Sequence, residues 1–466
     1  MPRSRPTLRR DRRAATLPPE LRTIHLNAAG IDIGAASHYV AVPPGRDPER
    51  RDVRQFGAFT ADLYALAAWL RLCGVDTVAM ESTGVYWIPL FDLLAEQGFE
   101  VKLVDPRQMK NVPGRKSDVL DCQWIQQLHT FGLLTGAFRP DDEICVLRSY
   151  LRQRAMLVTY AAHHIQHMQK ALEQMNLKLP EVVSDITGVT GMAIIGAILE
   201  GQRDPHALAA LRDYHCKQSE ETIAHALHGN WREEHLFELR QAVELLAFYQ
   251  QQIVACDRAT EAYLARFDDK SKGQTLPLPS RPRRRRRNDP AFDARRHLHR
   301  ITGVDLTRLD GIDAPTALKI VAEIGLDMTR WPTEKHFASW LGLAPGTNVS
   351  GGKKLSSRTK ASASRAAAAL RMAASSLYHS RSALGAFFRR IKARLGAPKA
   401  ITATGRKLAC LIYRMLRFGT EYVDRGQAYY ERRYHHHVLS HLTRRAEQLG
   451  YTLVKSDTRP LVTSHP

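Results

Sequence analysis

The sequence predicts an α/β domain at the N-terminus, followed by a long helical arm and a mainly α-helical C-terminal region. In residues 26–139, short apolar runs alternate with amphipathic segments, as in a sheet covered by helices. Residues 145–175 and 234–267 then carry apolar side chains at helical spacing. Beyond residue 300, Ala-rich and Ile-rich segments lie between glycines, which is typical of packed helices.

The α/β domain is predicted to contain six segments of regular structure. Each strand is a short apolar run that ends in a turn residue, and each helix has apolar residues three or four apart. The predicted segments are a strand pair at 31–42, a helix at 61–73, a strand at 76–81, a helix at 89–97, a strand at 99–104 and a helix at 118–130.

Four acidic residues occupy unusual places in this domain. Asp32 interrupts the apolar run AGIDIG, and Glu81 ends the apolar strand VDTVAME. Asp118 and Asp121 open a predicted helix, where a spacing of three puts both on one face. Gathered carboxylates repel one another unless cations lie among them, and such hard oxygen ligands suit Mg²⁺ or Mn²⁺. The alternative is structural, with Asp118 favouring the helix N-terminus and Ser117 as its cap.

Composition indicates a polyanionic partner. The 466 residues include 68 Lys and Arg against 47 Asp and Glu, a formal net charge of +21. Residues 335–420 contain no acid at all, although helix surfaces normally intersperse glutamates among lysines. This segment is expected to face phosphates.

The chain is expected to be cytoplasmic. No apolar run approaches 18 residues, so no membrane span is predicted. The arginine-rich N-terminus lacks an apolar signal region and is predicted to be a flexible basic arm. Six scattered cysteines without C-x-x-C spacing fit reduced thiols.

Two long helices separated by a smaller insert predict a helical hairpin or coiled-coil arm, and such arms commonly dimerise. An ordinary helix bundle is the alternative. The segment LDGI at 309–312 resembles a helix-hairpin-helix, in which the turn at Gly311 would offer backbone N–H groups to a phosphate. Residues 277–300 contain prolines and the run Arg283 to Arg287, which predicts a disordered basic linker. The histidines of YHHH at 434–437 are interpreted as part of a solvated tail.

The motif PGTNVSGGKK at 345–354 places Ser350 beside two glycines and two lysines. Glycines leave the hydroxyl accessible, and the lysines would hold a phosphate near it. On this motif alone, a simple loop is the competing interpretation. Ser356 and Ser357 are alternative nucleophiles.

Together, these motifs resemble the DEDD transposases of the insertion-sequence one-ten family. The resemblance rests on Asp32 after a strand, Glu81 in ESTGVYW, K-x-D-x-x-D at 116–121, and the distal AP to SGGK segment at 344–353. It covers about residues 29–424 and is closer to the branch in which a glycine-threonine pair precedes the serine motif. It implies an N-terminal domain similar to RuvC-type and RNase H-like enzymes.

The resemblance also implies roles for individual residues. The four metal-binding and catalytic acids would be Asp32, Glu81, Asp118 and Asp121, and the nucleophile would be Ser350. Nucleic-acid contacts are predicted for six further residues, namely Lys116, Gly311, Lys353, Lys354, Arg358 and Lys360.

The function implied is a magnesium-dependent or manganese-dependent serine recombinase that moves an insertion sequence. A structured bridge RNA would guide it by pairing with donor and target DNA. Homodimers or tetramers, organised by the arm, would combine acids and serine from different protomers. Two alternatives are a RuvC-like junction-resolving nuclease that uses water and a non-enzymatic nucleic-acid-binding protein.

The predicted domain organisation follows these features. It comprises a basic arm at 1–25, a RuvC-like DEDD domain at 26–142, a helical coiled-coil arm with insert at 143–268, a basic linker at 269–300, a helix-hairpin-helix-like domain containing the serine at 301–424 and a tail at 425–466.

Overall fold

The computed structural model describes residues 22–82, 84–106, 117–279, 285–360, 362 and 364–454. The chain forms two compact units that divide between Arg139 and Pro140. Most of the predicted basic arm and the last twelve residues lie outside the described residues. Within the described part, no helix combines the length and hydropathy that a membrane crossing requires.

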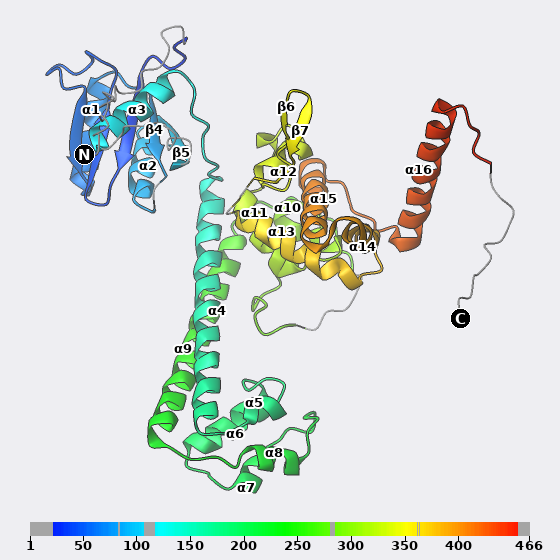
Figure 1. Cartoon of the computed structure of the whole chain (residues 1–466). Helices are drawn as coiled ribbons and strands as arrows, with labels where there is room; N and C mark the ends of the chain where they lie inside the picture. The colour runs from blue at the N-terminus through cyan, green and yellow to red at the C-terminus, as the bar shows by residue number, and fades with distance from the viewer. Residues whose placement is uncertain are drawn as a thin grey trace, which may run out of the picture. The chain divides into compact units, whose positions relative to one another are not determined.

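The first unit contains a five-stranded mixed sheet in the order β3-β2-β1-β4-β5 (Figure 1). The first three strands are antiparallel neighbours, whereas β4 and β5 run parallel to β1. The sheet confirms the predicted α/β class. Its strands are β1 (Ala28–Ile33), β2 (Ser37–Ala41), β3 (Val53–Gly57), β4 (Thr77–Glu81) and β5 (Glu100–Val104).

Helices cover both faces of this sheet. On one face, α1 (Thr60–Leu72) and α2 (Trp87–Glu96) bury a core that includes Ile31 and Met80. On the other face lies α3 (Asp118–Thr130), with a smaller core that includes Ala79. Successive residues of a strand point to opposite faces, so the two cores alternate along β1 and β4. The three helices confirm the predicted segments to within two residues.

Gly30 allows α3 to approach the sheet closely. A Cβ at this position would lie 2.2 Å from the backbone nitrogen of Gln126 and 2.4 Å from the carbonyl oxygen of Cys122. The Gln126 side chain also donates from Nε2 to the carbonyl oxygen of Ala28, at 3.2 Å. This contact fixes α3 against β1 and therefore fixes the acids that α3 carries.

We expect Gly30→Ala to lower the free energy of unfolding by about 3 kcal/mol, because the added methyl group meets backbone atoms that have no room to yield. Gly196→Ala is the matched control, since Gly196 lies within a helix and an added Cβ meets nothing within 4 Å. That control should be neutral or stabilising by up to about 1 kcal/mol. Denaturant unfolding would measure both. Equal stability of Gly30→Ala and the parent would contradict the close approach.

The second unit begins with two long helices, α4 (Asp142–Gln174) and α9 (Glu233–Leu264), which pack along each other as predicted. A buried ion pair joins them, with Arg154 Nε 2.6 Å from Asp257 Oδ1. The insert between them forms four short helices that share the buried core at the end of the pair. These are α5 (Leu179–Val182), α6 (Val189–Leu199), α7 (Pro205–Ala209) and α8 (Glu220–Ala226).

The rest of the second unit is helical apart from one hairpin. Its elements are α10 (Ala294–Thr302), η2 (Leu306–Arg308), α11 (Ala314–Ile324), η3 (Met328–Arg330), α12 (Glu334–Trp340), β6 (Asn348–Ser350), β7 (Lys353–Ser356), α13 (Arg365–Ser376), η4 (Leu377–His379), α14 (Ala383–Leu395), α15 (Ala397–Phe418) and α16 (Gly426–Gln448). This confirms the predicted mainly α-helical C-terminal region.

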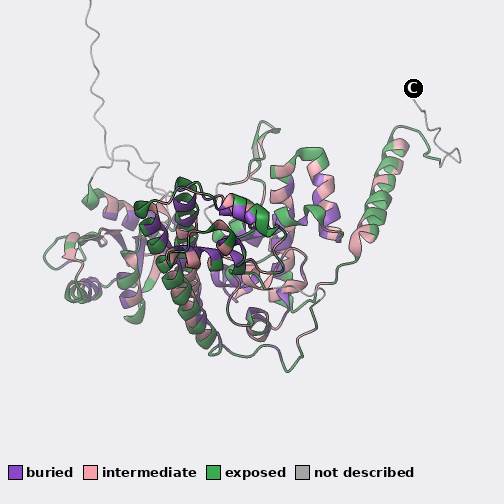
Figure 2. Ribbon diagram, turned by 90° about the horizontal axis from the view of Figure 1, so that it is seen from below, coloured by how far each residue is buried: buried purple, intermediate pink, exposed green. Residues whose placement is uncertain are grey.

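One prediction about this region, the disordered linker, was wrong in part. The C-terminal end of the predicted linker is the helix α10, which buries Leu298 and Ile301 and which Asp293 caps through the Arg296 N–H. The predicted tail contains the helix α16. Figure 2 shows α16 in the colours of exposed and intermediate residues, and none of its residues is buried.

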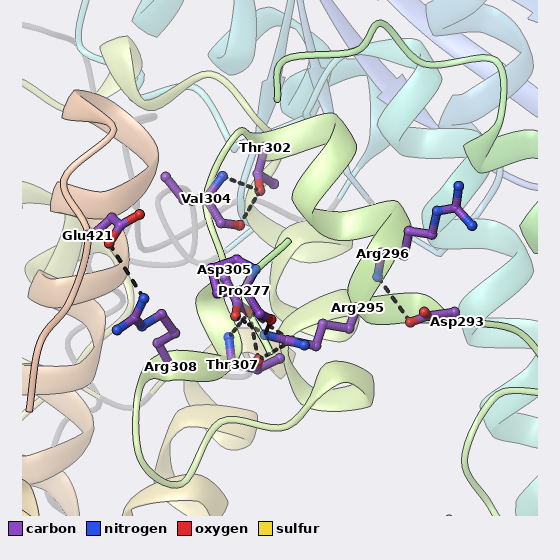
Figure 3. Close-up of polar contacts among 10 residues, drawn as sticks. All are labelled: Pro277, Asp293, Arg295, Arg296, Thr302, Val304, Asp305, Thr307, Arg308 and Glu421. Carbon is purple, nitrogen blue, oxygen red and sulfur yellow. Dashed lines mark hydrogen bonds and ion pairs between the residues drawn. The ribbon is translucent and has the colours of Figure 1, made fainter. Parts of the chain in front are cut away.

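A buried ion pair holds α10 to the turn that follows it (Figure 3). Arg295 Nη2 lies 2.5 Å from Asp305 Oδ2, and Thr307 donates from its hydroxyl and its N–H to Asp305 Oδ1. Burial acts to raise the pKa of Asp305, but the hydrogen bonds from Arg295 and Thr307 outweigh it and lower this pKa. The Asp305 side chain is 4% exposed, so removing its charge leaves a desolvated arginine.

We expect Asp305→Asn to cost about 3 kcal/mol of stability at neutral pH. Because the folded-state pKa is lowered, the ion pair stabilises the protein above the unfolded-state pKa of about 3.9, and this stabilisation is lost as pH falls through the folded-state pKa. The difference between variant and parent should therefore shrink in acid. Glu421→Gln breaks only an exposed pair with Arg308 and should cost under about 1 kcal/mol. Unfolding curves at neutral and acidic pH test this, and a pH-independent difference would contradict it.

Candidate active site

Asp32 and Glu81 lie side by side at the carboxyl ends of two adjacent parallel strands. The register of β1 and β4 pairs Gly30 with Ala79 and Ile31 with Met80, so Asp32 and Glu81 occupy the next position on each strand. Positions 30 and 79 face α3, and side chains two residues further along a strand face the same way. The two acids are therefore on one face of the sheet, at the same level.

The N-terminus of α3 lies at this end of the sheet. Near the C-terminus of α3, His129 Nε2 lies 2.9 Å from the Thr77 hydroxyl at the start of β4. Near its N-terminus, the carboxylates of two of the acids affect the pKa of the buried Cys122 thiol. Burial raises the pKa of Cys122, the carboxylates of Asp32 and Asp121 add to this rise, and the resulting pKa is about 12. The helix thus brings Asp121 toward Asp32.

Asp118 lies one turn before Asp121 and is exposed. The Ser117 hydroxyl accepts a hydrogen bond from the Leu120 N–H at 3.4 Å, which confirms the predicted cap. Since Ser117 fills the capping position, Asp118 is not needed as the cap. Its carboxylate still favours the helix N-terminus through the dipole.

The donor set suits a divalent cation. All four acids are carboxylates, the ligand type that Mg²⁺ and Mn²⁺ prefer, and they come from neighbouring strand ends and one helix N-terminus. Among the described residues, no three side chains of histidine, cysteine, aspartate or glutamate lie close enough together to hold a metal ion. The backbone therefore brings the acids to one region, and their side chains are not drawn into a closed ligand shell.

Ser350 lies in the second unit, at the tip of the β6–β7 hairpin. It pairs with Lys353 across a two-residue turn, in which Gly351 and Gly352 have φ values of +53° and +75°. Two consecutive positive φ values define the type I′ turn that suits such hairpins and favours glycine. Ser350 is exposed at the end of its strand. The turn therefore presents its hydroxyl to solvent, as the motif predicts.

Basic residues lie on the same hairpin and directly after it. Lys353, Arg358 and Lys360 are exposed, and Lys354 lies on β7 opposite Val349. Further along the hairpin, the Gly346 N–H donates to the carbonyl oxygen of Arg358 at 3.0 Å. Four of the six residues predicted to contact nucleic acid, Lys353, Lys354, Arg358 and Lys360, thus lie on this hairpin or directly after it. Lys116 lies outside the described residues.

Gly311 has a packing role in the structure. Its φ is +87°, and an added Cβ would lie 2.8 Å from the carbonyl oxygen of Ala373 on α13. The neighbouring Ile312 N–H donates to the Leu309 carbonyl oxygen, so the turn already uses that donor. These contacts account for the glycine without a ligand, and phosphate binding at Gly311 stays a prediction.

A cluster of aromatic and basic side chains lies on α14, α15 and α16 and was not predicted from the sequence. Arg390 Nε donates to the Tyr430 hydroxyl at 2.7 Å, and the Arg390 guanidinium lies 4.1 Å from the ring centre of Tyr434. The only local signal was the spacing of tyrosines and arginines in residues 425–434. The partners on α14 and α15 are too distant in sequence to be recognised beside them.

Known family models match both the segment that carries the four acids and the segment that carries Ser350. Residues 29–177, which include the four acids, match a DEDD transposase model of the IS110 family. Residues 304–389, which include Ser350, match the model described as Transposase IS116/IS110/IS902 family. Together the two segments cover about half of the chain. No curated protein matches it. Membership of a DEDD family implies dependence on a divalent metal. The matches confirm the resemblance, and the chain belongs to the IS110 family of transposases, which cleave and recombine DNA.

Proposed function

We propose that this transposase moves an insertion sequence by cutting and rejoining DNA through a phosphoserine intermediate. Ser350 is the nucleophile, and Asp32, Glu81, Asp118 and Asp121 hold Mg²⁺ or Mn²⁺. The observation that carries the proposal is the matched register of Asp32 and Glu81, which puts two carboxylates at one level beside the N-terminus of α3. Acidic residues are uncommon in mostly buried strands, and one stands near the end of each of these two neighbouring strands.

The reaction conserves one phosphodiester bond. The Ser350 hydroxyl loses its proton to a base and attacks the phosphorus of a DNA strand. The bond from phosphorus to one deoxyribose oxygen breaks, and that oxygen leaves as a hydroxyl. A hydroxyl of the new strand then displaces serine by the same exchange. When bound, a divalent cation supplies stabilisation of the negative charge that develops on the oxygens.

The acids would close around the metal only when metal and DNA are present. Four carboxylates repel one another in the free protein, which is consistent with their unclosed arrangement. Binding of the cation offsets this repulsion. We therefore expect the ligand shell to form on loading, with the strands and α3 as its rigid support.

Bridge RNA is the proposed guide, pairing with both donor and target DNA. The acid-free segment of residues 335–420 and the exposed Lys353, Arg358 and Lys360 support contacts to phosphates of RNA or DNA. We propose that the protein acts on DNA of the bacterial nucleoid as a dimer or tetramer. Exposed apolar side chains on α4 and α9, such as Met156 and Phe248, support association through the arm.

The test is strand exchange with a reprogrammed RNA. Purified protein, Mg²⁺ and labelled donor and target DNA are incubated with the element's flanking noncoding RNA, with no RNA, or with RNA whose guide segment matches a second target. We expect recombination only with RNA, at the target that the RNA specifies. Exchange without RNA would contradict guidance. Free cleaved ends without a protein adduct would favour the junction-resolving nuclease, and binding without cleavage would favour a non-enzymatic protein.

A further inference from the structure

A pocket of about 490 Å³ lies between α14, α15 and α16, in the second unit. Its volume is within the range of ordinary ligand sites. Its lining includes Arg390 on α14, Lys407 on α15, and Tyr430 and Tyr434 on α16. They belong neither to the DEDD acids nor to the Ser350 hairpin.

The positive charges of this pocket are held by aromatic rings. Arg390 lies over Tyr434, and the Lys407 ammonium lies 4.6 Å from the ring centre of Phe387. Burial lowers the pKa of Lys407, and the positive charges of Arg390 and Arg433 lower it further. These positive side chains therefore repel one another, and a bound anionic ligand would offset the repulsion.

No acid is among the described residues that line this pocket, and the nearby acids have other partners. The carboxylate of Asp424 accepts hydrogen bonds from the backbone N–H groups of Ala383 and Gly426. Glu431 lines the adjoining groove and accepts a hydrogen bond from Gln427 Nε2 at 2.5 Å. The described lining thus carries basic side chains without an acidic one, beside Tyr434, which is 39% exposed.

The shape favours a strand over a single nucleotide. A neighbouring groove of about 740 Å³ shares Arg390, Tyr430 and Tyr434 with the pocket. The two hollows therefore adjoin each other at these side chains, and together they offer more length than a single nucleotide needs. Basic grooves with ring platforms bind single strands, because phosphates contact the cations and bases stack on the rings. A duplex keeps its bases stacked inside and offers no such contact.

We infer that α14, α15 and α16 form a binding site for an unpaired nucleic-acid strand, with phosphates at Arg390 and Lys407 and a base on Tyr434. The inference goes beyond the proposed recombination and rests on the pocket alone. It requires neither a divalent metal nor Ser350.

Binding of labelled oligo(U) and oligo(dT), each about twelve nucleotides long, tests this site in the full-length protein. Fluorescence anisotropy is recorded in EDTA with excess unlabelled duplex, which occupies duplex-binding surfaces. We expect Tyr434→Leu and Lys407→Met each to weaken binding about tenfold. Lys407→Met should also lower the slope of log affinity against log salt by about one.

Two controls carry the same chemical changes outside the pocket. Lys170→Met removes an exposed lysine from α4, and Tyr451→Leu removes a tyrosine that is 73% exposed beyond α16. Both should bind like the parent. Tyr434 lies on a helix without buried residues, so its variant should keep the parent's melting temperature.

Equal effects of pocket and control variants would overturn the inference. Weakening by Lys407→Met without weakening by Tyr434→Leu would also overturn it. That pattern would mean that the site binds any polyanion through charge alone, without stacking of a base on Tyr434. Weakening confined to oligo(U) or to oligo(dT) would support the site and identify the strand as RNA or DNA. Strand exchange is measured separately, so its failure in the parent would leave the EDTA binding result intact.

Discussion

Asp32→Asn, alone or with Glu81→Gln, is expected to abolish the rise in melting temperature that Mn²⁺ or Mg²⁺ produces in the parent protein. It should also reduce strand exchange by about a thousandfold or more, because the displaced oxygens lose their electrostatic stabilisation. The two carboxylates share one level on adjacent strands, so each variant removes a donor from the same place. Without metal, the variants should be as stable as the parent or more stable, since like charges repel.

Asp76→Asn is the matched control for this experiment. Asp76 directly precedes β4, at the opposite end of the strand from Glu81, and its carboxylate accepts a hydrogen bond from Asn27. It carries the same charge on the same strand but cannot reach the acids. Thermal unfolding with increasing Mn²⁺ gives the readout, because a ligand that binds only the folded state stabilises it. An unchanged metal response in Asp32→Asn would contradict the proposed site.

Ser350→Ala is expected to eliminate strand exchange with labelled DNA, whereas Ser356→Ala should retain it. Ser350 is exposed beside the turn of the hairpin. The Ser356 hydroxyl instead accepts a hydrogen bond from the Arg358 N–H at 3.2 Å, which is a structural role. Both substitutions remove one hydroxyl from the same two-stranded hairpin. Melting temperatures should agree with the parent for Ser350→Ala, because an exposed side chain contributes little to stability.

The reverse pattern, with activity lost in Ser356→Ala and kept in Ser350→Ala, would identify Ser356 as the nucleophile. Activity in both variants would mean that neither serine is the nucleophile. DNA binding is recorded for each variant, so that loss of chemistry is distinguished from loss of substrate.

The sequence identified the elements with strong apolar periodicity. The helix at 118–130 has the predicted bounds, and the long helices α4 and α9 differ from prediction by at most three residues at each end. The edge strand β3 was not predicted, because VRQFG is only partly buried and has no clear apolar alternation. Strand order is a tertiary property. The level shared by Asp32 and Glu81 therefore required the structure.

The error in the linker has a physical cause. Charge dominated the interpretation of this segment, although a few apolar residues at helical spacing were present. In α10, Leu298 and Ile301 lie three residues apart among basic residues and are buried. The same composition concealed the pocket at α14–α16, where arginine and lysine pack against aromatic rings contributed by other helices.

The most direct test of the central claim is to identify the amino acid that becomes covalently linked to DNA. Parent protein is incubated with Mg²⁺, guide RNA and donor and target DNA, the adduct is isolated under denaturing conditions, and protease and nuclease digestion precede mass spectrometry. The account predicts a nucleotide attached to Ser350 and no adduct in Asp32→Asn. Cleaved DNA with no protein attached, or attachment at another residue, would contradict it.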